Sequence, residues 1–229
     1  MCGRFSLAAD PPTLTDLFLL NETPALSPRY NIAPTQTVAV VRPMDNQATR
    51  RLNLLHWGLI PSWAKDPRIG ARMINARAET VAEKPAFRSA FRRKRCLVPA
   101  DGFYEWVRSG SKKQPYHIRM RDGTPFAFAG LWERWEGPEG AIESCTLVTT
   151  EPNDLLRYLH HRMPVILAPD RYAVWLDPDC RSPELLQTCR SPYPPENMIA
   201  YPVGLRVNNP RNDDPECRDP SEEIGANPG

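Results

Sequence analysis

The sequence has no long apolar run and no pattern of disulfide-forming or metal-binding residues. None of its 229 residues belongs to a stretch of eighteen apolar ones, and the first ten lack the charged-then-apolar order of a signal peptide. The six cysteines include no C-x-x-C pair, and the four histidines are not spaced as metal ligands. We therefore expect a cytoplasmic protein with reduced thiols, no membrane association, no metal and no organic cofactor.

The net charge of only +2 conceals an unequal distribution. Residues 1–120 contain 19 Lys and Arg against 9 Asp and Glu, whereas residues 121–229 contain 10 against 18. Clustered cations provide the sequence-independent part of nucleic-acid binding, because they neutralise backbone phosphates. The alternative is that the two halves neutralise each other across the fold, and composition leaves both open.

Twenty-six prolines and twelve glycines divide the chain into short segments. Capping pairs begin helices at Asp10-Pro11 and at Ser182-Pro183, and Asn153 and Asp170 are caps for shorter ones. Strand-like runs occupy residues 37–42, 52–57, 96–99, 103–107, 116–120, 126–132, 145–150 and 164–167. This pattern predicts an α+β, mostly β single domain over residues 1–208, with barrel-like sheets and short peripheral helices. Residues 209–229 are rich in Pro, Asn and acidic side chains, which predicts a disordered tail.

The densest basic stretch, residues 88–95, has Phe87 and Phe91 interleaved with its cations. Such a run is commonly a solvated surface. It also fits a path for a single strand, where cations follow the phosphates and rings stack on bases. Trp63, in a short proline-bounded loop, is another candidate stacking ring.

Cys2, directly after Met1, carries the most specific chemistry in the chain. Removal of Met1 would leave an α-amine (pKa ~8) and a thiol (pKa ~8.5) on adjacent carbons. The amine attacks an aldehyde to form an imine, and the thiol then closes a five-membered ring. The alternative is an ordinary small residue near a frayed terminus.

Three other segments hold polar groups in apolar surroundings. Asn75 and Arg77 are two residues apart and therefore share a face if the segment is extended. Glu105 lies between two aromatic residues, where lost hydration raises a carboxyl pKa toward the range useful for proton transfer, although an edge strand would leave it exposed. His160 and His161 are adjacent, so at most one of them faces a site.

Taken in order, these segments resemble the SRAP family, the SOS-response-associated peptidase proteins. The resemblance runs from residue 1 to about residue 210 and rests on six ordered motifs, MCGRF, YNIAPT, HWGLIP, INARAET, ADGFYEW and HHRMP. It implies a mostly β single domain with a positively charged groove for single-stranded DNA. The mature N-terminal cysteine would capture abasic sites as a covalent thiazolidine, in a DNA damage or SOS response.

The resemblance also implies a role for individual residues. Cys2 would be the nucleophile, Asn75 would orient it, and Glu105 and His160 would handle protons. Arg4 and Arg77 would contact backbone phosphates, and Trp63 would stack on a base. The protein would be a monomer, would associate with the nucleoid when bound to DNA, and would meet the replication machinery there.

Two other functions remain open at this point. Cys2, His160 and Glu105 could form a triad-like set in an N-terminal-nucleophile cysteine peptidase, a hydrolase of the thiol protease type rather than a lyase-like crosslinker. The basic half could instead make the chain a non-covalent binder of modified DNA. A denaturant-stable adduct that needs both an aldehyde and the free Cys2 amine distinguishes the crosslinker from both.

Overall fold

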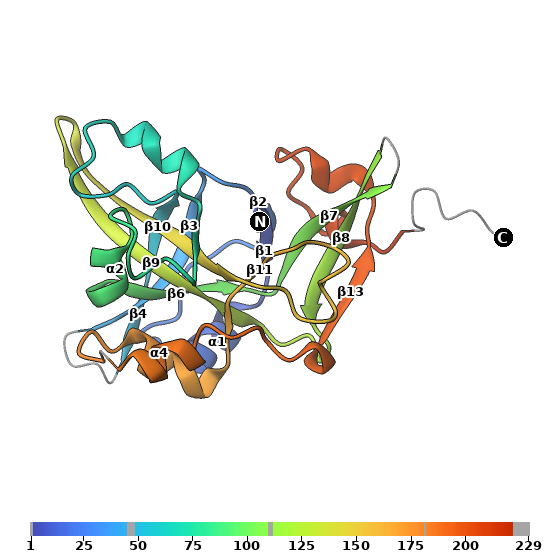
Figure 1. Ribbon diagram of the computed structural model, residues 1–229. Helices are drawn as coiled ribbons and strands as arrows, with labels where there is room; N and C mark the ends of the chain where they lie inside the picture. The colour runs from blue at the N-terminus through green and yellow to red at the C-terminus, as the bar shows by residue number, and fades with distance from the viewer. Residues whose placement is uncertain (1, 45–48, 110–111, 181, 222–229) are drawn as a thin grey trace.

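Short strands build two β-sheets in the computed structural model of the chain, which describes residues 2–44, 49–109, 112–180 and 182–221 (Figure 1). The larger sheet closes on itself because β9 pairs with both β6 and β10. Its ring consists of β3 (Thr37–Pro43), β4 (Arg50–Trp57), β6 (Arg95–Ala100), β9 (Phe126–Gly137) and β10 (Gly140–Thr150). Three short strands extend it, namely β5 (Asn75–Arg77), β11 (Met163–Pro164) and β12 (Ile166–Leu167). We call this sheet the barrel.

The second sheet has the strand order β13-β8-β7-β1-β2. Its members are β1 (Phe5–Leu7), β2 (Arg29–Ile32), β7 (Gly102–Ser109), β8 (Lys112–Met120) and β13 (Met198–Pro202). Only Asp101 separates β6 of the barrel from β7, so the chain passes directly from one sheet to the other. A side chain at Gly102 would displace the buried His117 ring, since a Cβ there would lie 2.2 Å from Nε2 of His117.

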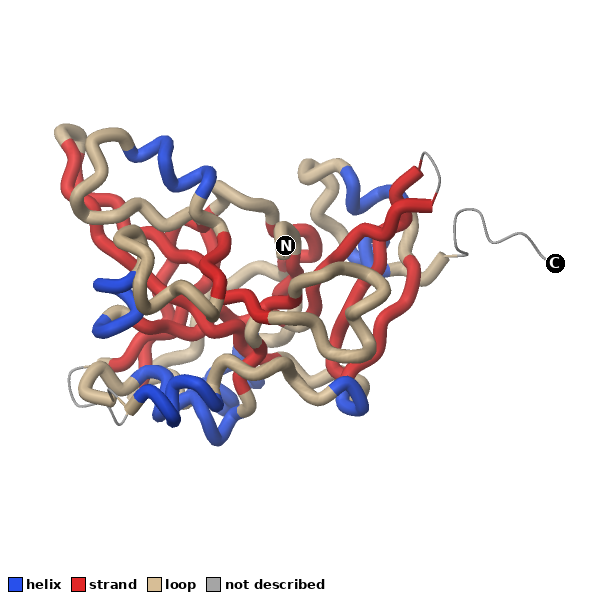
Figure 2. Tube along the Cα trace, viewed as in Figure 1, coloured by secondary structure: helices blue, strands red, loops and turns tan. Residues whose placement is uncertain are grey.

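Helices are short and lie at the periphery of the strands (Figure 2). Asp10 caps α1 by accepting a hydrogen bond from the Thr13 amide, and Ser182 caps α4 in the same way from Leu185. The α-helices are α1 (Pro11–Phe18), α2 (Arg88–Arg93), α3 (Tyr172–Leu176) and α4 (Pro183–Thr188). The 3-10 helices are η1 (Pro67–Arg72), η2 (Pro169–Arg171), η3 (Pro195–Asn197), η4 (Leu205–Asn208) and η5 (Pro215–Arg218). No helix among the described residues is long and apolar enough to cross a membrane.

Phe5 of β1 fixes the beginning of the chain against the barrel. Its ring lies 5.1 Å from that of Trp57 and 5.7 Å from that of Phe128, both in edge-on contact. All three rings are buried, and such pairs add about 0.5–1.5 kcal/mol beyond the area they bury. Because β1 also pairs with β2 and β7, the residues just before it are held where the two sheets meet (Figure 1).

The mostly β, barrel-like fold class is confirmed, and all but one of the predicted strand-like runs correspond to a single strand. The run at residues 164–167 is instead divided between β11 and β12, which pair with β10 and β9 respectively. The tail prediction needs a correction, because residues 209–221 are folded against the second sheet. Asp213 accepts hydrogen bonds from the amides of Tyr30 and Asn31 at 2.5 and 2.8 Å, and Cys217 is fully buried. A polar side chain of this segment therefore accepts hydrogen bonds from main-chain amides at the open edge of β2, so the segment is not a loose, solvated chain. Residues 222–229 lie outside the described residues.

Candidate active site at the beginning of the chain

Cys2 is completely buried just before β1. Its thiol points to the main-chain oxygen of Arg4, with 3.9 Å between sulfur and oxygen. Burial raises the pKa of the Cys2 thiol well above its ordinary value, and the nearby charge of Glu105 raises it further. The thiol is therefore protonated at neutral pH and must lose its proton during any reaction. Met1 lies outside the described residues, so its removal stays a prediction.

Asn75 contacts Cys2 from the barrel. It begins β5, which pairs in parallel with β10, and its side-chain amide donates a hydrogen bond of 2.8 Å to the Cys2 carbonyl. Its other polar atom, Oδ1, is buried and has no hydrogen-bond partner among the residues that the structure describes. One end of the amide thus holds Cys2, while the other can accept a hydrogen bond from a ligand.

Glu105 enters the site from β7 of the second sheet and is only 4% exposed. Burial raises the pKa of its carboxyl to about 7, and the positive charge of the amino terminus partly opposes that rise. The side chain is therefore poised to exchange a proton near neutral pH. Its effect on the pKa of Cys2 places the two groups within electrostatic reach of each other.

His160 lies in the loop between β10 and β11 and is more buried than the exposed His161, against which its ring stacks with centroids 4.2 Å apart. Burial lowers the pKa of His160, and the positive charge of the amino terminus lowers it further. The charge of the amino terminus thus acts on the pKa of both Glu105 and His160. Of the two histidines, His160 is the more buried, and its part in the site stays a prediction.

The three predicted DNA contacts are in different environments. Arg77, in β5, is exposed, and Trp63 is 60% exposed in a turn. The guanidinium of Arg4 is already engaged, since Nη1 donates to the side-chain oxygen of Asn31 (2.6 Å) and to the Val207 carbonyl (2.7 Å). Arg4 thus anchors the C-terminal segment in this structure, and its contact with phosphate stays a prediction.

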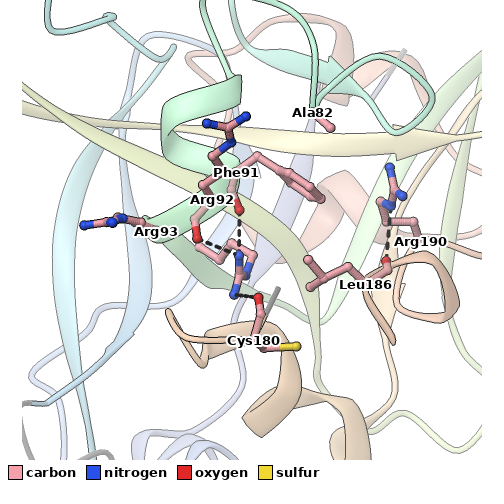
Figure 3. Close-up of a pocket in the computed structure, with 8 residues that line it drawn as sticks. Ala82, Phe91, Arg92, Arg93, Cys180, Leu186 and Arg190 are labelled. Atoms are coloured by element: carbon pink, nitrogen blue, oxygen red, sulfur yellow. Dashed lines mark hydrogen bonds between the residues drawn. The ribbon is translucent and has the colours of Figure 1, made fainter. Parts of the chain in front are cut away.

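The basic stretch at residues 88–95 does not form a continuous row of exposed cations and rings. It folds into α2 and the first residue of β6, where Phe91 is buried and Arg95 donates to main-chain oxygens of five residues. The acceptors are the carbonyls of Phe91, Arg92, Trp175, Asp177 and Cys180. Figure 3 shows the adjacent cavity of about 450 Å³, with Phe91 facing Leu186 and Arg93 directed away from them. Arg95 and Phe91 of this stretch therefore have a structural role, whereas Arg88, Arg92 and Arg93 are exposed.

Two residues of the site region escaped sequence reasoning, although both lie inside motifs that it singled out. Glu79 and Arg162 form a two-pronged ion pair beside His160. They are 83 residues apart in the chain, and no local spacing joins them. Within the described residues no group of three or more His, Cys, Asp or Glu is arranged to hold a metal ion.

Comparison with known proteins identifies the family. The family model described as SOS response associated peptidase (SRAP) matches residues 1–210. A Bacillus subtilis protein named abasic site processing protein YoaM is 46% identical over 96% of this chain and 98% of its own length. The abasic site processing protein YedK of Escherichia coli is 32% identical over 96% and 100%, and HMCES of Xenopus tropicalis is 34% identical over 83% and 65%.

A solved structure has the same fold. The crystal structure of a protein from Bacteroides thetaiotaomicron aligns with a TM-score of 0.86 at 28% identity, and covers 96% of this chain and all of its own. Cys2, Asn75, Glu105 and His160 are all within the matched residues 1–210. The chain belongs to the SRAP family.

Proposed function

We propose that this chain processes abasic sites in DNA by forming a covalent crosslink through Cys2 in single-stranded DNA. The observation that carries the proposal is the convergence on Cys2 of Asn75 from the barrel and Glu105 from the second sheet. The relatives named for abasic-site processing support the action on abasic sites. The crosslink and the preference for single strands are inferred from the chemistry of the site.

The chemistry needs both nucleophiles of an N-terminal cysteine. The neutral amine adds to C1′ of the open-chain aldehyde, and loss of water gives an iminium ion. The thiol sulfur then forms a bond to the same carbon as the C=N π electrons return to nitrogen, and the thiol proton leaves to a base. The net products are a thiazolidine and one water, with no change in oxidation state.

Glu105 suits the proton transfers in this sequence. An abasic deoxyribose is mostly a closed hemiacetal, so a base must remove its hydroxyl proton as the ring opens. The Glu105 carboxylate, whose conjugate acid has a pKa of about 7, can accept that proton and pass it to the ring oxygen O4′ as the C1′–O4′ bond breaks. The carboxylate is then free to accept the thiol proton in the later step. His160, whose pKa is also lowered by the charge of the amino terminus, would exchange protons in ring opening or in reversal of the adduct.

The site geometry fits a cysteine peptidase less well. A thiol protease relies on a thiolate formed beside a histidine. Here the thiol of Cys2 points to the carbonyl of Arg4, and burial raises its pKa. The imidazole Nδ1 of His160 is turned toward the main chain of Arg162. The crosslinking reaction tolerates a protonated thiol, because the amine attacks first.

Single strands suit the surface around the site better than duplex does. Trp63 is a largely exposed ring that can stack on an unpaired base, and Arg77 is an exposed cation two residues from Asn75. An abasic nucleotide must also leave any helical stack to bring C1′ to the buried Cys2. The partner is therefore single-stranded DNA that contains an abasic site, at places where replication exposes it.

The deciding experiment is a denaturing gel of the purified protein after incubation with an abasic single-stranded oligonucleotide. We expect a denaturant-stable adduct with the wild type and none with Cys2→Ala. Cys2→Ser keeps the amine but cannot form the thiazolidine, and should give an adduct only after borohydride reduction. Cys180→Ala, which removes a partly exposed thiol elsewhere, is the control and should react as the wild type. Stable crosslinking by Cys2→Ala would overturn the proposal.

A further inference from the structure

Glu79 and Arg162 form an ion pair next to His160, which we call the Glu79–Arg162 clamp. The carboxylate of Glu79 accepts two hydrogen bonds from Arg162, from Nη1 at 2.7 Å and from Nη2 at 2.9 Å. Nη2 also donates to the main-chain oxygen of Thr149 at 2.6 Å, on β10. Three acceptor contacts therefore fix the Arg162 side chain, which is only 12% exposed. A two-pronged pair of this kind fixes orientation as well as distance.

The main chain of Arg162 in turn faces one nitrogen of the His160 ring. The Arg162 amide donates to Nδ1 at 2.9 Å, and the Arg162 carbonyl oxygen lies 3.0 Å from the same atom. A neutral ring can accept from the amide, and a protonated ring can donate to the carbonyl. Nδ1 thus has a main-chain partner in both protonation states. The ring can therefore keep one orientation while its charge changes.

We propose that Glu79 is a positioning residue, which fixes Arg162 so that the Arg162 main chain sets the orientation and tautomer of His160. The proposal rests on the proposed function insofar as His160 handles protons there. The tautomer of His160 does not depend on that function. The neutral ring carries its proton on Nε2, because the Arg162 amide donates to Nδ1.

The charges around His160 determine how its pKa changes when the Glu79–Arg162 ion pair is removed. The amino terminus, His161 and Arg162 all lower the pKa of His160, whereas its hydrogen bond to the Arg162 main chain raises it. Glu79 neutralises Arg162 and also interacts with Arg77 and Arg190. Replacing Glu79 with a neutral residue leaves Arg162 uncompensated and loosens the main-chain hydrogen bond. Both changes lower the pKa of His160.

The test compares Glu79→Gln with a matched control. Glu143→Gln removes a similar two-pronged pair, in which Arg42 donates to Glu143 at 2.8 and 3.0 Å. Neither Arg42 nor Glu143 is among the groups that shift the pKa of His160. Ring-nitrogen NMR on protein labelled at its four histidines reports the tautomer and titration of each, with His160→Gln used for assignment. Glu79→Asp, which keeps the charge but shortens the reach, is the second variant.

We expect the wild-type neutral ring to be protonated at Nε2. Glu79→Gln should mix the tautomers and lower the titration midpoint of His160, Glu79→Asp should do so less, and Glu143→Gln should match the wild type. The rate of adduct formation or exchange should fall by about tenfold in Glu79→Gln, less than general acid/base groups themselves contribute.

Two results would overturn the positioning role: His160 signals in Glu79→Gln that match the wild type, or an equal change in Glu143→Gln. Failure of the wild type to crosslink would instead overturn the proposed function, because the NMR measurement needs no DNA.

Discussion

The side-chain amide of Asn75 donates a 2.8 Å hydrogen bond to the main-chain carbonyl of Cys2, across 73 residues of sequence. This bond joins the barrel to the first residue of the proposed mature chain. It constrains the direction of both the amine and the thiol of Cys2, because the carbonyl shares their α-carbon. Positioning of this kind is valuable in a reaction between one protein residue and one carbon atom.

Asn75→Asp replaces the donor in this bond with an acceptor that repels the Cys2 carbonyl. We expect the rate of crosslinking at saturating DNA to fall by at least about tenfold, since small displacements of a reacting group cost up to ~10²-fold. DNA affinity should change little. Single-turnover gel assays and anisotropy measurements separate the two quantities, and Asn21→Ala, at an exposed turn, should leave both unchanged. An unimpaired rate in Asn75→Asp would remove Asn75 from the site.

Glu105→Gln should change how the crosslinking rate depends on pH. The folded-state pKa of Glu105 is raised to about 7, so its carboxylate, the form that accepts a proton, becomes populated as pH rises through that value. The wild-type rate should therefore increase across pH 7. Glu105→Gln should be slower by ~10²-fold or more and should retain only the increase that reflects the amine, near pH ~8. Identical pH profiles for the two proteins would exclude Glu105 as the base.

Arg77→Ala should weaken non-covalent binding to single-stranded DNA of any sequence by a similar factor, because a phosphate contact carries no base information. The slope of log affinity against log salt should fall by about 0.7, the value expected for one contact on a single strand. Arg134→Ala is a suitable control, since that exposed arginine is paired with Glu136 on a distant hairpin. The measurement is fluorescence anisotropy at several salt concentrations. A shift confined to one base sequence would contradict the assignment.

Asp213→Ala tests the folded C-terminal segment. The carboxylate of Asp213 accepts two main-chain amides of β2 and pairs with Arg29. Its loss leaves both amides without their partner and should lower the free energy of unfolding by about 1–3 kcal/mol in urea denaturation. Asp16→Ala, at an exposed position of α1, should have almost no effect. If residues 209–221 were a loose tail, the two variants would be equally stable.

The sequence by itself determined the local features of this protein. Alternating and β-branched runs predicted strands such as β3 and β10, because side-chain periodicity depends only on neighbouring residues. Capping residues Asp10 and Ser182 marked the starts of α1 and α4 for the same reason. The candidate residues Cys2, Asn75, Glu105 and His160 were also identified from local chemistry and from ordered motifs.

Only the tertiary structure decided which of these residues meet and what else holds them. The short strands β1, β2 and β5 have three or four residues each, too few for a periodic signal. They form through pairing with remote strands: β1 pairs with β7 and β2, and β5 pairs with β10. Several side-chain contacts also depend on the tertiary structure, because the two partners are distant in sequence. They are Glu79 with Arg162, Arg4 with Val207, and Asp213 with β2. Such contacts form when the closed barrel and the second sheet bring remote segments together, a long-range event that no local pattern encodes.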